Sequence, residues 1–183
     1  TATLNETSQA RFVHPRMVHR IAGAPLIGGP TLVECRRIDT PGMQGFIAAH
    51  DGYEARFGIR HEREMRLSDN GDVLDGTDRF FGKDGMTILA NGKDLAAIRF
   101  HIHPNIRVEK STGGEIFLIG HSGECWAFLS PDVFPTVEES VYFASSSGAR
   151  RTSQIVITTL LSKTPVVRWR MARETPGSRS PRP

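Results

Sequence analysis

The most informative segment of the sequence is residues 59–81, which read IRHEREMRLSDNGDVLDGTDRFF. In its first nine residues, Ile, His, Arg, Met and Leu alternate with four charged residues. This period of two predicts a strand with one solvated, charged face and one mostly apolar inner face. The turn Ser68-Asp69-Asn70-Gly71 then predicts a hairpin, in which Val73 to Phe81 form the returning strand.

The same alternation recurs along nearly the whole chain. Short turns rich in Gly and Ser separate the runs, and only Pro131 to Thr136 suggests a single helical turn. The further predicted strands are Thr31 to Ile38, Gln44 to His50, Ile98 to His103, Glu115 to Ile119, Cys125 to Leu129, Val137 to Phe143, Gln154 to Leu161 and Val166 to Met171. About ten to twelve short strands must bury their inner faces against each other. This predicts an all-β fold, an antiparallel β-sandwich of the jelly-roll-like or supersandwich kind.

Composition and charge exclude several classes of protein. With 38% hydrophobic and 23% charged residues, the chain is typical of a globular protein, and no apolar run approaches the roughly 20 residues that cross a bilayer. The net charge is +3, but residues 168–183 hold five Arg and one Glu, so the rest of the chain is near neutral. This predicts no nucleic-acid partner and no membrane partner. Residues 173–183, rich in Arg, Pro and Ser, are predicted to be a disordered tail.

Two histidines and one arginine stand out. His50 ends a strand before an Asp-Gly turn, where it is either a plain loop residue or a group facing a cleft. His61 and Arg63 lie on the inward face of their strand. Because an unpaired buried Arg is costly, they either meet acids in a buried network or line a polar cleft, and the network is favoured. The acids of residues 69–78 are interpreted as a solvated hairpin.

The pair His101-x-His103 has a spacing that can chelate zinc, with His121 or Glu115 as a third ligand, but an exposed polar face is the favoured interpretation. Cys35 and Cys125 allow one disulfide at most, and in apolar strands each is by default a buried free thiol. No catalytic motif with complete spacing occurs.

Several segments, taken in order, resemble one family. They are Thr3 to Ser8 with Ala10 to Phe12, Ala49 to Tyr53, Arg56 to Gly58, His61 to Arg63, Arg99 to Pro104, Glu124 to Trp126, Glu139 to Tyr142 and Arg150 to Val156. Together they resemble the C-terminal β-sandwich region of the heparinase II/III-like polysaccharide lyases of proteobacteria. The resemblance covers residues 1–172, which are therefore expected to form one domain.

The resemblance implies a function beyond what the pattern indicates. Such lyases pair an N-terminal α/α-toroid with a β-sandwich and cleave uronic-acid polysaccharides by β-elimination. A group neutralises the uronate carboxylate, a base takes the C5 proton and a Tyr protonates the leaving oxygen. The Tyr and one His belong to the toroid, and a second His precedes the stretch matched here. This chain is therefore expected to lack catalytic residues and to be inactive in isolation.

The resemblance also implies candidate site residues. The expected substrate-cleft wall consists of His50, Tyr53, Arg56, His61 and Arg63. Some relatives hold a structural divalent metal, zinc or calcium, for which His50 is the expected ligand, with Glu6 as a weaker one. The expected partners are an acidic polysaccharide and the toroid domain. The family implies a periplasmic location, and the sequence carries no export signal that would distinguish it from a cytoplasmic one.

Two alternatives remain open at this point. The first is an independent cupin-like metal-binding barrel that uses His101 and His103, and metal analysis of variants at both positions separates it from the lyase interpretation. The second is a stand-alone carbohydrate-binding or assembly module, whose Arg-rich tail contacts an acidic partner.

Overall fold

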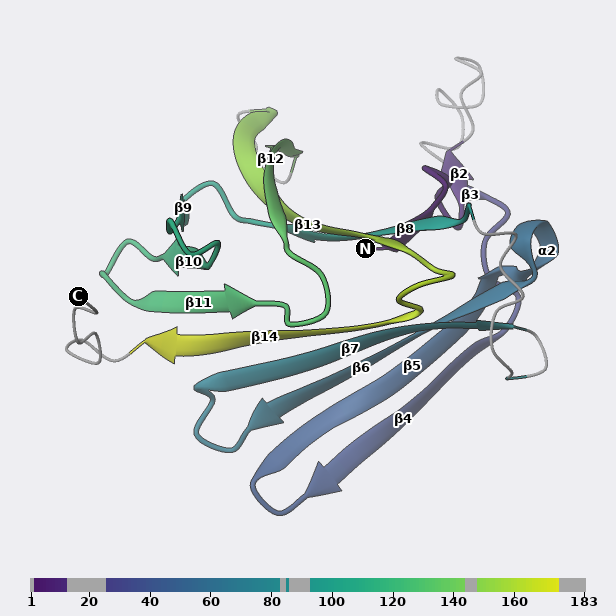
Figure 1. The fold of residues 1–183 in the computed structure, drawn as a ribbon, viewed down its shortest axis with the longest axis horizontal. Helices are drawn as coiled ribbons and strands as arrows, with labels where there is room; N and C mark the ends of the chain where they lie inside the picture. The colour runs from purple at the N-terminus through teal and green to yellow at the C-terminus, as the bar shows by residue number, and fades with distance from the viewer. Residues whose placement is uncertain (1, 13–25, 83–84, 86–92, 144–147, 175–183) are drawn as a thin grey trace.

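A computed structural model describes residues 2–12, 26–82, 85, 93–143 and 148–174. Two antiparallel sheets of unequal size face each other (Figure 1). The all-β antiparallel sandwich predicted from the alternation is therefore confirmed. The predicted disordered tail lies outside the described residues, apart from residues 173 and 174, which continue the last described strand.

The smaller sheet has the strand order β1-β8-β13-β12. These strands are β1 (Ala2–Leu4), β8 (Leu95–His101), β13 (Arg150–Leu160) and β12 (Thr136–Tyr142). The register sets Ile98 between Ala2 and Ile157, so apolar residues from three strands lie side by side. Sequence alternation missed β1, because three residues are too few to establish a period.

The larger sheet has the order β4-β5-β6-β7-β14-β11-β10-β9. Strand β14 joins two meanders, one of four strands and one of three. The strands are β4 (Val33–Thr40), β5 (Met43–Tyr53), β6 (Ile59–Ser68), β7 (Val73–Gly82), β14 (Val166–Glu174), β11 (Cys125–Leu129), β10 (Ile116–Ile119) and β9 (Arg107–Lys110). A separate short pair is formed by β2 (Arg11–Phe12) and β3 (Leu26–Ile27).

The predicted hairpin of residues 59–81 is confirmed as β6 and β7. Gly71 adopts a left-handed φ of 74° and donates its N–H to Ser68 O at 2.8 Å, which closes the turn. The predicted helical turn at Pro131 to Thr136 is wrong: this segment connects β11 to β12 without a helix. Among the described residues the helix is α2 (Glu54–Phe57), which ends at Gly58 in a left-handed conformation.

The core lies between the two sheets and is rich in aromatic residues. The Phe100 ring of β8 meets Phe128 at 5.0 Å and Trp169 at 4.8 Å between ring centroids, edge to face in both cases. Around them, Ile98, Ile155 and other apolar side chains are fully buried. This cluster fixes the smaller sheet over β6, β7, β14 and β11.

Strands β4 and β5 carry the larger sheet past the smaller one (Figure 1). On the inner face of this overhang, Phe46 is 38% and Val33 64% exposed. Cys35 on β4 is exposed and Cys125 is half-buried, and both thiols are free. The default of a buried thiol is therefore wrong for Cys35, because nothing in the smaller sheet covers β4.

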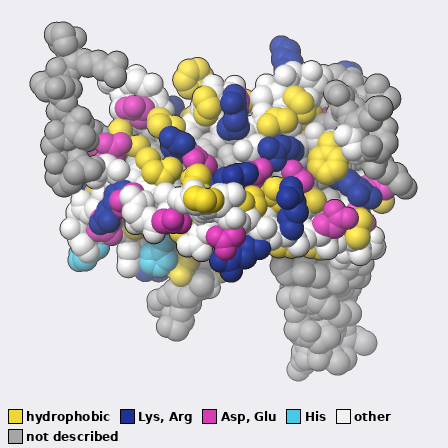
Figure 2. All heavy atoms as spheres, turned by 90° about the horizontal axis from the view of Figure 1, so that it is seen from below, with side chains coloured by type: hydrophobic (Ala, Val, Ile, Leu, Met, Phe, Trp, Pro, Cys, Tyr) yellow, Lys and Arg dark blue, Asp and Glu magenta, His cyan; other side chains and the backbone are white. Residues whose placement is uncertain are grey.

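The outer face of the larger sheet carries interleaved charges. Arg79 Nη1 lies 3.0 Å from both Glu62 Oε1 and Glu64 Oε2, and Arg170 pairs with Asp75. Figure 2 shows acidic and basic side chains mixed with apolar ones on the side of the molecule it presents. Arg79 and Arg170 are therefore neutralised locally.

Candidate functional site

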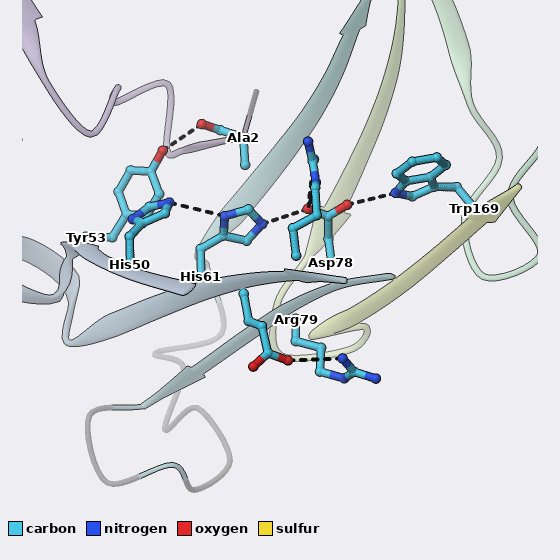
Figure 3. Close-up of polar contacts among 9 residues, drawn as sticks. Ala2, His50, Tyr53, His61, Asp78, Arg79 and Trp169 are labelled. Atoms are coloured by element: carbon cyan, nitrogen blue, oxygen red, sulfur yellow. Dashed lines mark hydrogen bonds and ion pairs between the residues drawn. The ribbon is translucent and has the colours of Figure 1, made fainter. Parts of the chain in front are cut away.

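The inward side chains of β5, β6 and β7 form a polar chain inside the sandwich. The β5–β6 register places His50 opposite His61, and the β6–β7 register places Arg63 opposite Asp78. Immediately after His50 the ladder is irregular until Tyr53 pairs with Ile59. This irregularity and α2 turn the chain so that His50, His61 and Asp78 lie in line (Figure 3).

Asp78 is the centre of this chain and is fully buried. Its Oδ1 receives hydrogen bonds from His61 Nε2 at 2.7 Å and from Arg63 Nε at 2.8 Å, and its Oδ2 receives one from Trp169 Nε1 at 2.9 Å. Burial opposes ionisation, but the hydrogen bond from His61 and the charge of Arg63 hold the pKa of Asp78 below its usual value. The carboxylate is therefore ionised and shared by donors from two neighbouring strands.

The two histidines have a defined hydrogen-bond direction. His50 Nδ1 accepts the Gly52 N–H at 3.2 Å, so the proton of a neutral His50 ring sits on Nε2. This Nε2 lies 3.3 Å from His61 Nδ1, and His61 Nε2 faces Asp78. His50 therefore donates to His61, which donates to the carboxylate. Burial, and then the neighbouring His61, lower the pKa of His50 to about 4.

Packing fixes the rest of the network. The His61 ring stacks on Phe80 at 4.8 Å, and the guanidinium of Arg63 lies over the Phe100 ring at 5.7 Å. His61 is 6% exposed, whereas 21% of the Arg63 side chain reaches solvent. Sequence reasoning favoured a buried network with acids for His61 and Arg63, and the structure confirms it.

The remaining predicted cleft residues lie in different environments. Tyr53 is 1% exposed and its hydroxyl donates to Ala2 O at 2.6 Å, while burial raises its pKa to about 12. Arg56 is exposed on α2. Burial thus keeps Tyr53 and His61 from a solvent-facing surface of this chain. A cleft position stays a prediction for His50, Arg56 and Arg63.

The expected metal ligands are not gathered among the described residues. Within these residues, no three His, Cys, Asp or Glu side chains form a group that could hold an ion. Glu6 is exposed, and both ring nitrogens of His50 already face hydrogen-bond partners within the chain. Residues that could complete a site are not brought to His50 here, so a metal at His50 and Glu6 stays a prediction.

His101 and His103 lie at the end of β8 and contact β12. His101 Nδ1 is 3.0 Å from Ser140 Oγ, and the His103 ring meets the Tyr142 ring at 4.9 Å. His121 is exposed in the loop between β10 and β11, and Glu115 is exposed just before β10. The described structure gives this pair no third metal ligand.

The residue that sequence reasoning missed is Asp78. The composition of residues 69–78 predicts a solvated hairpin, yet Asp78 is the fully buried partner of His61 and Arg63. The signal was present: the loop centred on Asn70 and Gly71 sets position 67 opposite 74. Moving four residues away from the loop along each strand places Arg63 opposite Asp78, on the inward face.

Comparisons with known proteins agree with this architecture. Residues 1–170 match the family described as heparinase II/III-like, C-terminal. The chain is 30% identical over 145 residues to FtsZ-localized protein C of Caulobacter vibrioides (strain NA1000 / CB15N), covering 74% of this chain and 24% of that protein.

Solved structures share the fold at low sequence identity. Heparan sulfate lyase HepC from Pedobacter heparinus superimposes with a TM-score of 0.60 and 12% identity, over 85% of this chain and 24% of that enzyme. The heparinase III BT4657 gene product gives a TM-score of 0.58 and 10% identity, over 80% of this chain and 22% of that chain. This chain thus spans about a quarter of the length of the relatives it matches. With the family match over residues 1–170 and the sandwich in place, the chain belongs to the heparinase II/III-like family, as its C-terminal region.

Proposed function

We propose that this chain is the non-catalytic β-sandwich part of a polysaccharide lyase that cleaves uronic-acid polysaccharides by β-elimination. The observation that carries the proposal is the family match over residues 1–170, in a chain that aligns with only about a quarter of the lyases sharing its fold. The catalytic toroid is then supplied by another part of the protein. A periplasmic location accompanies this proposal, and cell fractionation tests it.

The geometry of the polar network supports a role without proton transfer to substrate. β-Elimination requires a base near the C5 proton and an acid near the leaving oxygen. Here His61 lies between His50 and Asp78, and Asp78 accepts three hydrogen bonds. The Tyr53 hydroxyl is bonded to Ala2 O. The polar atoms of these groups are hydrogen-bonded within the chain, so we assign the network a structural role in the cleft wall. His50 and Arg63 are partly exposed and are the members able to face a glycan.

The overhang supports a contact with the rest of the protein. Its inner face continues the sheet surface that forms the core, and a hollow of about 590 Å³ lies between Phe46, Met65, Leu67 and Leu74. Apolar surface of this kind is typical of an interface between domains. We assign it to the toroid, which gives the sandwich its second role as a support for the catalytic domain.

An activity assay on two samples tests the proposal. The isolated chain and the native protein, captured with an antibody against this domain, are incubated with alginate and with heparan sulfate. The ultraviolet absorbance of unsaturated uronate is then followed. We expect product from the native protein and none from the isolated chain. Product from the isolated chain would contradict the non-catalytic role, and a native protein inactive on all uronans would contradict the lyase assignment.

A second candidate function is assembly with FtsZ. It is favoured by one observation, the 30% identity to FtsZ-localized protein C, which exceeds the 10–12% identity to the lyases. A fluorescent fusion of the native protein imaged together with FtsZ tests it. Co-localisation with FtsZ supports the assembly function, and a distribution independent of FtsZ contradicts it.

A further inference from the structure

The outer face of the smaller sheet gathers polar and aromatic side chains at one end. Ile155 and Ile157 of β13 are fully buried in the core, so alternation turns Arg150, Thr152 and Gln154 outward. Cross-strand partners share a face, and the register pairs Gln154 with His101 and Arg150 with Tyr142. This end of the sheet, hereafter the β12 face, therefore carries His101, His103, Tyr142 and Arg150.

The contacts on the β12 face leave donors directed to solvent. His103 Nδ1 accepts the Asn105 N–H at 3.2 Å, which places the proton of the neutral ring on Nε2. The His103 ring also meets the Tyr142 ring edge to face, at 4.9 Å and 74°. Within the described part of the chain, no side chain binds His103 Nε2 or the Arg150 guanidinium. A ligand can therefore use them without breaking an existing bond.

The charge of the β12 face differs from that of the larger sheet. On the larger sheet Arg79, Arg168 and Arg170 are each paired with carboxylates. On the β12 face the acid is Glu138, and its Oε2 already receives the Gln154 amide at 3.1 Å. Arg150 has no carboxylate partner among the described residues, and Arg99 adds a second positive charge further along β8. The exposed Arg150 guanidinium is therefore available on this face to pair with a carboxylate.

We propose that the β12 face is a second binding site, which takes a uronate residue of an acidic polysaccharide. The planar guanidinium of Arg150 matches a carboxylate in a two-bond geometry. The Tyr142 ring offers an apolar surface to the C–H groups of a sugar, and the imidazoles of His101 and His103 bind its hydroxyls. The site lies on the opposite side of the smaller sheet from the His50 network, so it holds the polysaccharide outside the predicted cleft.

The inference rests on the polysaccharide partner of the proposed function, and calorimetry tests it. The full chain is titrated with an alginate tetrasaccharide, and with a neutral tetrasaccharide of glucose as a control ligand. We expect Arg150→Gln and Tyr142→Ala to weaken alginate binding roughly five- to tenfold, because each removes one main contact. Tyr142→Phe keeps the ring and Arg36→Gln removes an exposed arginine on β4, so both should stay within about twofold of the unsubstituted chain.

The outcomes separate this inference from the function on which it rests. No alginate binding by the unsubstituted chain overturns the β12 site together with the polysaccharide partner. Binding that is unchanged in both Arg150→Gln and Tyr142→Ala overturns only the β12 site. If Tyr142→Ala fails to fold by circular dichroism, Arg150→Gln decides alone, since its side chain is exposed. A native protein without lyase activity contradicts the elimination reaction and leaves the binding result standing.

Discussion

Replacing Asp78 by Asn removes a buried charge while keeping the shape of the side chain. The carboxylate accepts three hydrogen bonds, from His61, Arg63 and Trp169, and both of its oxygens are used. An amide must put its NH₂ group at one of those two positions, where it meets a donor. The Arg63 guanidinium also loses its counter-ion, from which its buried Nη2 lies only 2.8 Å away.

The expected cost is large for a single substitution. Removing one partner of a buried ion pair costs roughly 3–5 kcal/mol. At roughly 2–4 °C per kcal/mol for a domain of this size, the melting temperature should fall by about 6–20 °C. The matched control is Asp75→Asn on the same strand, which breaks a half-exposed ion pair with Arg170 and should cost about 1 kcal/mol or less.

Urea denaturation followed by tryptophan fluorescence measures both variants. Asp78→Asn should lower the free energy of unfolding by at least about 2 kcal/mol more than Asp75→Asn does. If Asp78→Asn does not fold, Trp169→Phe removes one of the three donors and should cost roughly 1–3 kcal/mol, partly from lost packing. Equal stabilities of the Asp78 and Asp75 variants would refute the reasoning that the buried carboxylate organises the three strands.

Three further predictions concern single residues. Because the pKa of His50 is lowered to about 4, the unfolded chain binds more protons between about pH 4 and 6.5, so stability should fall as the pH drops through this window. His50→Gln should remove on the order of 1 kcal/mol of this loss of stability, as measured by urea denaturation across the window, given the partial exposure of the ring. A Cβ at Gly76 would lie 2.0 Å from the indole ring of the core, so Gly76→Ala should lower the melting temperature clearly more than Gly113→Ala, whose nearest atom is 3.6 Å away. Tyr53→Phe should cost about 1 kcal/mol in thermal unfolding through the lost bond to the first strand, and no change would show that this bond contributes nothing.

Local pattern was sufficient for most of the strands and for part of the site. Residues 59–81 form the predicted hairpin because side-chain period and turn chemistry are local properties. The cost of burying Arg63 without an acid correctly indicated a network. To identify that acid, the cross-strand register is needed. Composition alone does not single out Asp78, because Asp69 and Asp72 belong to the same acidic run and are exposed or half-exposed.

Features set by distant contacts were not accessible in the same way. Cys35 lies in an apolar run, yet its exposure depends on where the smaller sheet ends. Strand β1 is defined by its pairing with β8, in which Ala2 lies opposite Ile98. The burial of Tyr53 follows from that same pairing, because its hydroxyl reaches the backbone of β1. Such properties depend on contacts between distant segments of the folded sandwich, so the sequence has no periodic pattern from which they can be predicted.

The position of β14 has a consequence for how the domain is made. The meanders β4–β7 and β9–β11 each form from neighbouring hairpins, but β14 lies between them and is the last described strand to leave the ribosome. Its docking brings Trp169 to Asp78, a contact between residues 91 positions apart. Until then the nascent chain holds two half-sheets with open edges, which readily pair with other chains. Folding yield in the cell should therefore depend on chaperones that shield those edges until translation of this strand is complete.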